Sequence, residues 1–147
     1  MLDLDLVGAI LHHLFVFAMF AVLFAEFVSV RPGMNDATVA RTAAIDASYG
    51  ALAGLILIVG FARAIFAAKG WDYYAHNAFF WAKIGTFAII GLLSIPPTLA
   101  FLKWRRKSAS PTHEAVARVR RYLWLEVMLF ALLPAFAAVM ARGYGEF

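Results

Sequence analysis

Four apolar stretches, each long enough to cross a lipid bilayer, most strongly constrain how this chain can fold. They cover roughly residues 6–30, 36–68, 77–102 and 113–142, and a transmembrane helix needs about 20 predominantly apolar residues. Short connections join the stretches, so consecutive helices are expected to run antiparallel. The sequence therefore predicts an all-α fold, an integral membrane four-helix antiparallel bundle that forms a single transmembrane domain over residues 1–147.

The composition indicates a membrane protein rather than a water-soluble one. Hydrophobic residues make up 64% of the 147 residues and charged residues only 15%, which is more apolar surface than a soluble domain of this size can bury. The chain contains no cysteine, which excludes disulfides and thiolate metal sites. The net charge of +4 does not indicate nucleic-acid binding, because the basic residues cluster beside the apolar stretches.

The distribution of basic residues predicts the orientation of the helices. Most Lys and Arg residues lie in or beside the connections after the first and third stretches: Arg31, Arg41, Lys103, Arg105, Arg106, Lys107, Arg118, Arg120 and Arg121. By the positive-inside rule these connections are cytoplasmic, and both termini lie on the outer, periplasmic side of a bacterial inner membrane. The acidic start of the chain and the length of the first stretch predict a retained helix rather than a cleaved signal peptide.

Polar residues within the apolar stretches are the candidates for function, because a charge near the centre of a bilayer costs at least about 3 kcal/mol. Counting depth along each helix at about 1.5 Å per residue sorts these residues into two layers. The outer layer contains His12, Arg63 and Lys83, and the inner layer contains Glu26, Arg41, Asp46 and Glu126. We therefore expect a basic site in the outer third of the membrane and a mainly acidic site in the inner third.

The first helix contains two adjacent histidines, and helical geometry distinguishes them. His12, Met19 and Glu26 are spaced by seven residues, so they share one helix face, whereas His13 lies about 100° away. Glu26 must face the bundle interior to avoid the lipid. His12 is therefore predicted to face inward with Glu26, and His13 to pack between helices or reach toward the interface.

An inward-facing histidine in a membrane has three natural functions: axial ligand to haem iron, ligand to copper or zinc, or member of a proton relay. A hydrogen bond between two helices is the purely structural alternative. Haem is favoured here, because Arg63 and Lys83 lie at the depth of His12 and can pair with propionate groups. The second axial ligand stays open between Met140, His76 and Lys83.

Several segments resemble the HemJ-type protoporphyrinogen oxidases. Residues 10–24 resemble the first helix of that family, with His12 on the family's histidine. Residues 81–83 resemble an Ala-Lys pair at the start of its third helix, and residues 121–126 resemble an Arg-Phe…Asn-Glu element that opens its last helix. Arg41 matches a basic residue ahead of the second helix.

The chain also departs from the HemJ pattern. Met19 stands where that family tends to have Trp, Leu125 where it has Asn, and Met128 where it has Pro. Residues 45–50 and 94–97 are more similar to a group of uncharacterised bacterial predicted membrane proteins. That group resembles HemJ-type and CopD-type copper-resistance proteins in its four-helix bundle, and this chain is expected to belong to it.

The resemblance implies a b-type haem or porphyrin site, with His12 as the axial ligand of the haem iron and redox chemistry on a porphyrin or quinone-like substrate. The residues assigned to cofactor binding are His12, Arg63, Lys83, Met140 and Arg41. Lys83, Glu26 and Glu126 are assigned to catalysis, the two acids as a proton path toward the cytoplasm. The chain would then be a haem-dependent membrane oxidoreductase.

A function of a different class stays open. The chain is also compatible with a non-enzymatic membrane protein for copper handling, small-solute transport or complex assembly. In the copper version His12, Met19 and Met140 would be soft ligands for Cu(I). The lipid bilayer is the one partner that the sequence requires, and the many aromatic residues of so small a bundle are compatible with a homodimer.

Overall fold

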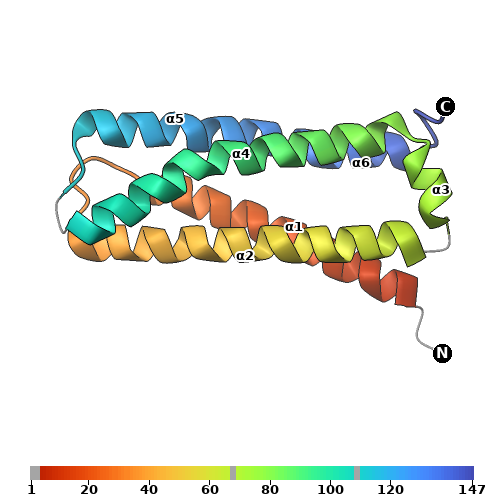
Figure 1. Ribbon diagram of the computed structural model, residues 1–147, viewed down its shortest axis with the longest axis horizontal. Helices are drawn as coiled ribbons and strands as arrows, with labels where there is room; N and C mark the ends of the chain where they lie inside the picture. Colours follow the sequence, from red (N-terminus) through yellow and green to blue (C-terminus); the bar gives the residue numbers. More distant parts are fainter. Residues whose placement is uncertain (1–3, 67–68, 108–109) are drawn as a thin grey trace.

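The computed structural model describes residues 4–66, 69–107 and 110–147, and these residues are almost entirely helical (Figure 1). The helices are α1 (Leu4–Ser29), α2 (Asp36–Phe66), α3 (Gly70–Ala75), α4 (Ala78–Lys107), α5 (His113–Phe130) and α6 (Leu132–Ala141). Four spans are long and apolar enough to cross a membrane: α1, α2, α4, and α5 with α6. Consecutive spans run antiparallel, which confirms the predicted four-helix membrane bundle.

The helices differ from the predicted ones in three places. α4 continues to Lys107 rather than ending near residue 102, and the basic residues of its last turn are favourable at the negative end of the helix dipole. The fourth span is two helices separated at Ala131, because Pro134 has no N–H to bond the carbonyl of Phe130. The connection after α2 contains α3, which was not expected. Residues 67–68, predicted to end the second stretch, lie outside the described residues.

The packing of the spans is tighter at one end of the bundle than at the other. α1 packs along α2, α2 packs against α4, and α4 packs against both α5 and α6. α1 also packs against α5, but within the described residues it makes no close backbone approach to α6. The α1–α2 pair and the α4–α6 pair therefore diverge toward the end where α3 lies (Figure 1). The bundle is closed at the α5 end and open at the α3 end.

Apolar side chains fill the interior and also cover the exterior. The large side chains with less than 2% exposure include Phe101, Met19, Leu23, Met34, Ile90 and Leu123. Outward-facing apolar residues are equally prominent, with Phe17, Ile58 and Leu92 each more than 60% exposed. Such a surface is stable only in an apolar solvent, so the outer faces of the spans contact the lipid bilayer.

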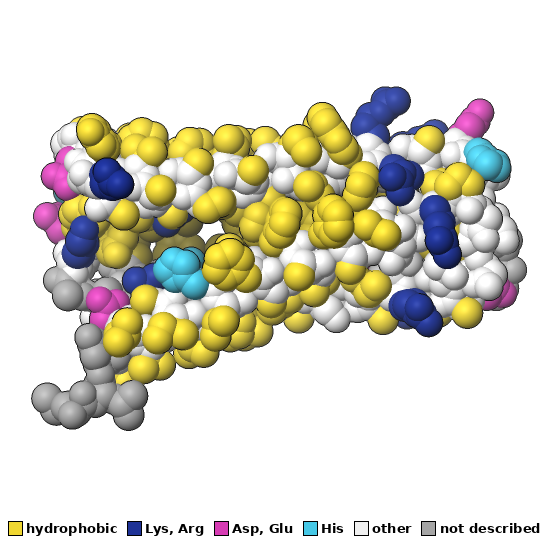
Figure 2. Space-filling model, turned by 180° about the vertical axis from the view of Figure 1, so that it is seen from behind, with side chains coloured by type: hydrophobic (Ala, Val, Ile, Leu, Met, Phe, Trp, Pro, Cys, Tyr) yellow, Lys and Arg dark blue, Asp and Glu magenta, His cyan; other side chains and the backbone are white. Residues whose placement is uncertain are grey.

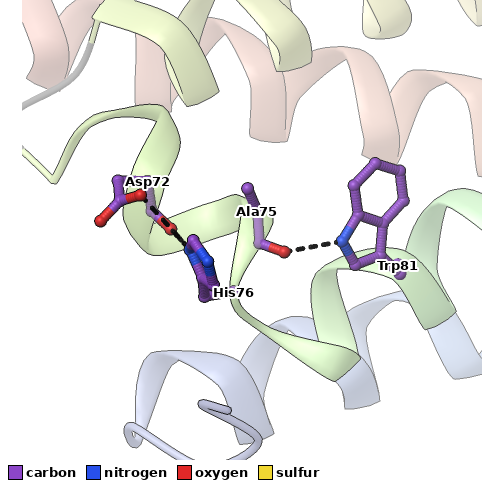
Figure 3. Close-up of polar contacts among 4 residues, drawn as sticks. All are labelled: Asp72, Ala75, His76 and Trp81. Atoms are coloured by element: carbon purple, nitrogen blue, oxygen red, sulfur yellow. Dashed lines mark hydrogen bonds and ion pairs between the residues drawn. The ribbon is translucent and has the colours of Figure 1, made fainter.

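The turn between α3 and α4 is fastened by hydrogen bonds from side chains to the backbone (Figure 3). Trp81 donates from Nε1 to the carbonyl of Ala75 over 2.9 Å. Nδ1 of His76 lies 2.9 Å from the backbone carbonyl oxygen of Asp72 and 3.3 Å from the side-chain Oδ1 of Asp72. These contacts hold the turn at the open end of the bundle.

Asn77 connects this turn to the C-terminal segment. Its side chain is fully buried, and its Oδ1 accepts hydrogen bonds from the backbone N–H groups of Phe79 (3.0 Å) and Phe80 (3.3 Å) at the start of α4. Its Nδ2 donates to the carbonyl of Tyr144 over 3.0 Å. Asn77 therefore caps α4 and anchors the segment after α6.

Replacing Asn77 with Ala is expected to lower the free energy of unfolding by about 2 kcal/mol, because it removes a helix cap and the hydrogen bond to the carbonyl of Tyr144. Denaturant titration of the detergent-solubilised protein measures the change. The control is Thr112→Ala, which removes the exposed cap of α5, where the Thr112 side chain accepts from Ala115 N–H. Equal losses of unfolding free energy in both variants would show that the contact with Tyr144 does not stabilise the fold.

Candidate functional site

The face of α1 that carries His12 points into the bundle. Met19 and Glu26 are each only 1% exposed, whereas His13 is exposed and its Nδ1 lies 2.7 Å from the carbonyl of Ala9 on the same helix. These observations confirm the predicted difference between the two histidine positions.

The ring of His12 packs against the backbone of α2 at Gly60. A Cβ atom added at Gly60 would lie 3.2 Å from Cε1 of His12 and 3.6 Å from its Nδ1. Nδ1 is buried and has no hydrogen-bond partner in the described part of the chain. Within the described residues, this nitrogen therefore does not form the hydrogen bond between helices that the purely structural alternative requires.

Two basic side chains from different helices accompany His12. Arg63 of α2 lies across Gly8 of α1, its Cγ 3.3 Å from the position of a Cβ atom there, and its Nε is 3.8 Å from Oδ1 of Asp5. Lys83 of α4 is close enough to His12 and Arg63 for their charges to interact. Three helices thus bring His12, Arg63 and Lys83 together, as their predicted common depth required.

The charges of this cluster are incompletely balanced. Asp5 is the one acidic group in an ion pair with Arg63 among the residues described. Lys83 has no ion pair with any described residue, and its Nζ lies 5.8 Å from the ring centroid of Phe80. A histidine with two cations and one peripheral acid is suited to an anionic ligand.

The cluster lies at the open end of the bundle. The space-filling view shows a hollow between the N-terminal half of α1 and the opposite layer of helices, with histidine and basic side chains at its edge (Figure 2). Because α1 and α6 make no close backbone approach in the described residues, this hollow opens on the outer, lipid-facing side of the bundle. A ligand can therefore reach the cluster sideways from the membrane.

The other residues assigned to a cofactor lie elsewhere. Met140 is half-buried on α6, and its carbonyl accepts a hydrogen bond from Tyr73 over 3.1 Å. His76 is exposed and turned toward Asp72 (Figure 3). Arg41 is exposed at the opposite end of α2, because it lies on the outward face of a turn whose inward residues are Val39 and Thr42. The structure brings none of the three into contact with His12.

The inner layer forms a second polar site, in which three carboxyl groups are buried. Glu26 is 1%, Asp46 8% and Glu126 0% exposed. Tyr49 donates to Oε2 of Glu126 over 3.2 Å, and Thr98 donates to Oδ1 of Asp46 over 2.8 Å. Glu26 interacts electrostatically with both of the other carboxyl groups. α1, α2, α4 and α5 therefore all contribute to one cluster.

Sequence reasoning missed two members of the acidic site. Tyr49 lies three residues after Asp46 within the same apolar stretch, so helical spacing could have placed it on the same face. No spacing in the sequence could have identified Thr98, because its contact with Asp46 depends on the register between α2 and α4.

A cavity of about 80 Å³ adjoins this cluster at Asp46. Its lining includes the polar residues Asp46, Tyr49, Ser94 and Thr98, together with Met19, Gly50, Ala53, Phe87 and Gly91. No atom lies within 4 Å of a Cβ position at Gly50 or Gly91, so these glycines leave open space. The cavity has the size and polarity to hold several water molecules.

Comparison with known proteins gives one match. A family model described as a predicted membrane protein (DUF2214) matches residues 4–145. No curated protein and no solved structure matches the chain. The match agrees with the expected placement among uncharacterised predicted membrane proteins, and none of the comparisons links the chain to HemJ-type or CopD-type proteins.

Replacing Gly60 with Ala is expected to displace the His12 ring, because the added methyl group would stand 3.2 Å from Cε1. Nitrogen NMR of ¹⁵N-histidine-labelled protein measures the effect as a shift of the His12 ring resonances with the His13 resonances unchanged. Gly54→Ala is the matched control, since no atom lies within 4 Å of a Cβ there. Identical spectra for the two variants would contradict the placement of His12 on Gly60.

Proposed function

Since this chain belongs to the DUF2214 family of predicted membrane proteins, whose description names no reaction, we propose a function from its own side chains. It binds a b-type haem or a related porphyrin at His12 and acts as a membrane oxidoreductase. The observation that carries the proposal is the convergence of His12, Arg63 and Lys83 at a hollow open to the lipid.

The residues present fit such a group. His12 has a buried ring nitrogen without a partner, and Gly60 permits close approach of its ring to α2. Arg63 and Lys83 can pair with the two propionates of a haem, since guanidinium and ammonium groups both bind carboxylates. Packed helices lie about 8–10 Å apart, and the wider separation of α1 and α6 leaves room for a planar group between them.

A bound haem would supply one-electron oxidation and reduction at the membrane. His12 would hold the iron and Arg63 and Lys83 would orient the ring edge. Lys83 would also face the substrate, for which a porphyrin or a quinone-like molecule is the expected class. The resemblance to HemJ-type oxidases supports this reading through His12, Lys83 and Glu126, and the second axial ligand is left unassigned.

The orientation in the membrane belongs to the same proposal. Exposed basic residues gather at the end of the bundle that carries the C-terminus of α4 and the start of α5: Lys103, Arg105, Arg106, Lys107, Arg118 and Arg121. The positive-inside rule places this end in the cytoplasm of a bacterial inner-membrane protein. The His12 site would then lie in the outer, periplasmic half.

No observation favours the copper alternative. Met19 is seven residues from His12 on one helix, which separates them by about 10 Å along the axis and prevents both from binding one ion. Within the described ranges, no three His, Cys, Asp or Glu side chains come together as a metal site. Transport and assembly roles likewise have no specific contact in their favour.

His12→Ala is expected to abolish haem binding, whereas His13→Ala should retain it, because only His12 faces the site. The measurement is an optical spectrum of detergent-purified protein from haem-supplied cells, oxidised and then reduced with dithionite. The unsubstituted protein should show a Soret band that sharpens and shifts on reduction, near one haem per chain.

Two results would overturn the proposal. One is a flat spectrum of the unsubstituted protein under ample haem supply. The other is a Soret band that survives in His12→Ala. Circular dichroism and size-exclusion chromatography of each variant separate loss of the site from loss of the fold, and His13→Ala controls for a change of one histidine in α1.

Lys83→Gln and Arg63→Gln are each expected to speed haem loss about tenfold, since a charge-assisted hydrogen bond contributes about 1.5 kcal/mol. Transfer of haem to a scavenging protein measures the rate. Lys69→Gln is the control, because Lys69 is exposed and lies 4.1 Å from the ring centroid of Tyr73, outside the cluster. Unchanged rates in both site variants would exclude the two cations as propionate partners.

A further inference from the structure

The buried carboxyl cluster contains oxygen atoms that nothing in the described protein satisfies. Oε2 of Glu26 and Oε1 of Glu126 are buried and have no hydrogen-bond partner among the residues described. Both side chains are at least 99% buried, and Glu26 interacts with Glu126 and Asp46 through their charges. The unsatisfied oxygens therefore belong to acidic groups of one buried cluster.

Among residues 4–66, 69–107 and 110–147, no basic side chain forms an ion pair with this cluster. Arg120, the partly buried basic residue of α5, donates from Nη1 to the carbonyls of Phe27 and Val30 at the end of α1 and stacks on the Phe27 ring. Arg41 and Arg121 are exposed, and Tyr49 and Thr98 contribute only neutral hydroxyl groups. Uncompensated carboxylates are costly to bury, so they are expected to carry protons.

A metal ion is not an equivalent solution here. Among the described residues, no group of three or more His, Cys, Asp or Glu side chains is arranged to hold one. A carboxyl group that binds a proton instead becomes neutral and gains an O–H donor. A proton is therefore the ligand that matches the unsatisfied oxygens.

The cluster is closed toward the basic end of the bundle. Each spanning segment presents buried apolar side chains between the carboxyl groups and that end: Val30 and Met34 after α1, Val39 and Ala43 of α2, Phe101 and Trp104 of α4, and Val116, Val119 and Leu123 of α5. All of them are less than 9% exposed. This layer blocks the direct path from the carboxyl groups to the cytoplasm that the sequence suggested.

On the opposite side, the cluster adjoins a cavity at Asp46. The cavity of about 80 Å³ begins at Asp46 and Thr98 and extends to Met19 and Ala53, two helical turns farther toward the α3 end. It offers water several polar partners and is large enough for several molecules. From Met19 and Ala53, two more turns of α1 and α2 lead to the His12–Gly60 contact.

We propose that Glu26, Asp46 and Glu126 form a proton-binding site inside the bundle that is filled through this cavity from the α3 half of the membrane and is sealed from the basic end. A hydronium ion entering the cavity protonates one carboxylate oxygen and leaves a water molecule. Buried acids beside a hydrated cavity commonly mark proton sites in membrane proteins. The site stands whether or not His12 binds a haem.

Infrared spectroscopy of the full chain in lipid tests the bound proton directly. A carbonyl stretch of protonated carboxylic acid that shifts in D₂O is expected at neutral pH. Glu26→Gln and Glu126→Gln should each reduce its intensity by roughly half or more. Glu114→Gln is the matched control, because Glu114 is an exposed residue of α5, and it should leave the band unchanged.

Several infrared results would contradict the proposed proton site. Absence of the band at neutral pH would overturn the proposal, as would a band that both Glu variants leave intact. Loss of the band on adding sodium would show a metal cation in place of the proton. Asp46→Asn gives a third variant if either Glu substitution prevents folding. His12→Ala should leave the band unchanged, so failure of the haem proposal is distinguishable from failure of this one.

Cysteine accessibility tests the direction of access, since the chain has no cysteine of its own. Ser94→Cys places a thiol in the cavity wall, while Asp72→Cys and Glu114→Cys mark the α3 end and the basic end. In sealed vesicles, a small membrane-impermeant methanethiosulfonate should modify Ser94→Cys from the side that modifies Asp72→Cys. Modification from the Glu114 side, or from neither side, would refute the proposed access.

Discussion

The cost of placing charged side chains in hydrocarbon governs the arrangement of this protein. A bilayer offers no water to backbone or side-chain polar groups, so helices satisfy the backbone and the bundle interior must accommodate ionisable residues. Glu26, Glu126 and Asp46 lie inside for that reason. His12, Arg63 and Lys83 are only partly enclosed, because they occupy the end where the bundle is open.

The two ends of the bundle differ because different contacts fix them. At the basic end, Arg120 donates to the carbonyls of Phe27 and Val30 and so holds the end of α1 against α5. At the other end, Asn77 ties α4 to the segment after α6, while α1 packs on α2 and makes no close backbone approach to α6 within the described residues. The same chain therefore has a sealed apolar layer on one side and a lipid-facing hollow on the other.

One face of α1 connects the two polar sites. His12, Met19 and Glu26 follow each other at two-turn intervals on this face, and Met19 lines the cavity between the sites. A redox group at one end and a proton site at the other would together permit electron and proton transfer to be coupled within a single bundle. The proposed haem site and the proposed proton site nevertheless rest on separate contacts and separate measurements.

The sequence alone determined the membrane fold, the four spans and the inward face of α1, because hydropathy and helical periodicity are local properties of the chain. The common depth of His12, Arg63 and Lys83 also followed from counting residues along helices. The sequence did not determine the break at Ala131, the helix α3 or the exposure of Arg41. Only the tertiary structure decided that Thr98 meets Asp46, that apolar side chains close the basic end and that α1 and α6 diverge. These features depend on the register and crossing of separate helices, which no local pattern specifies.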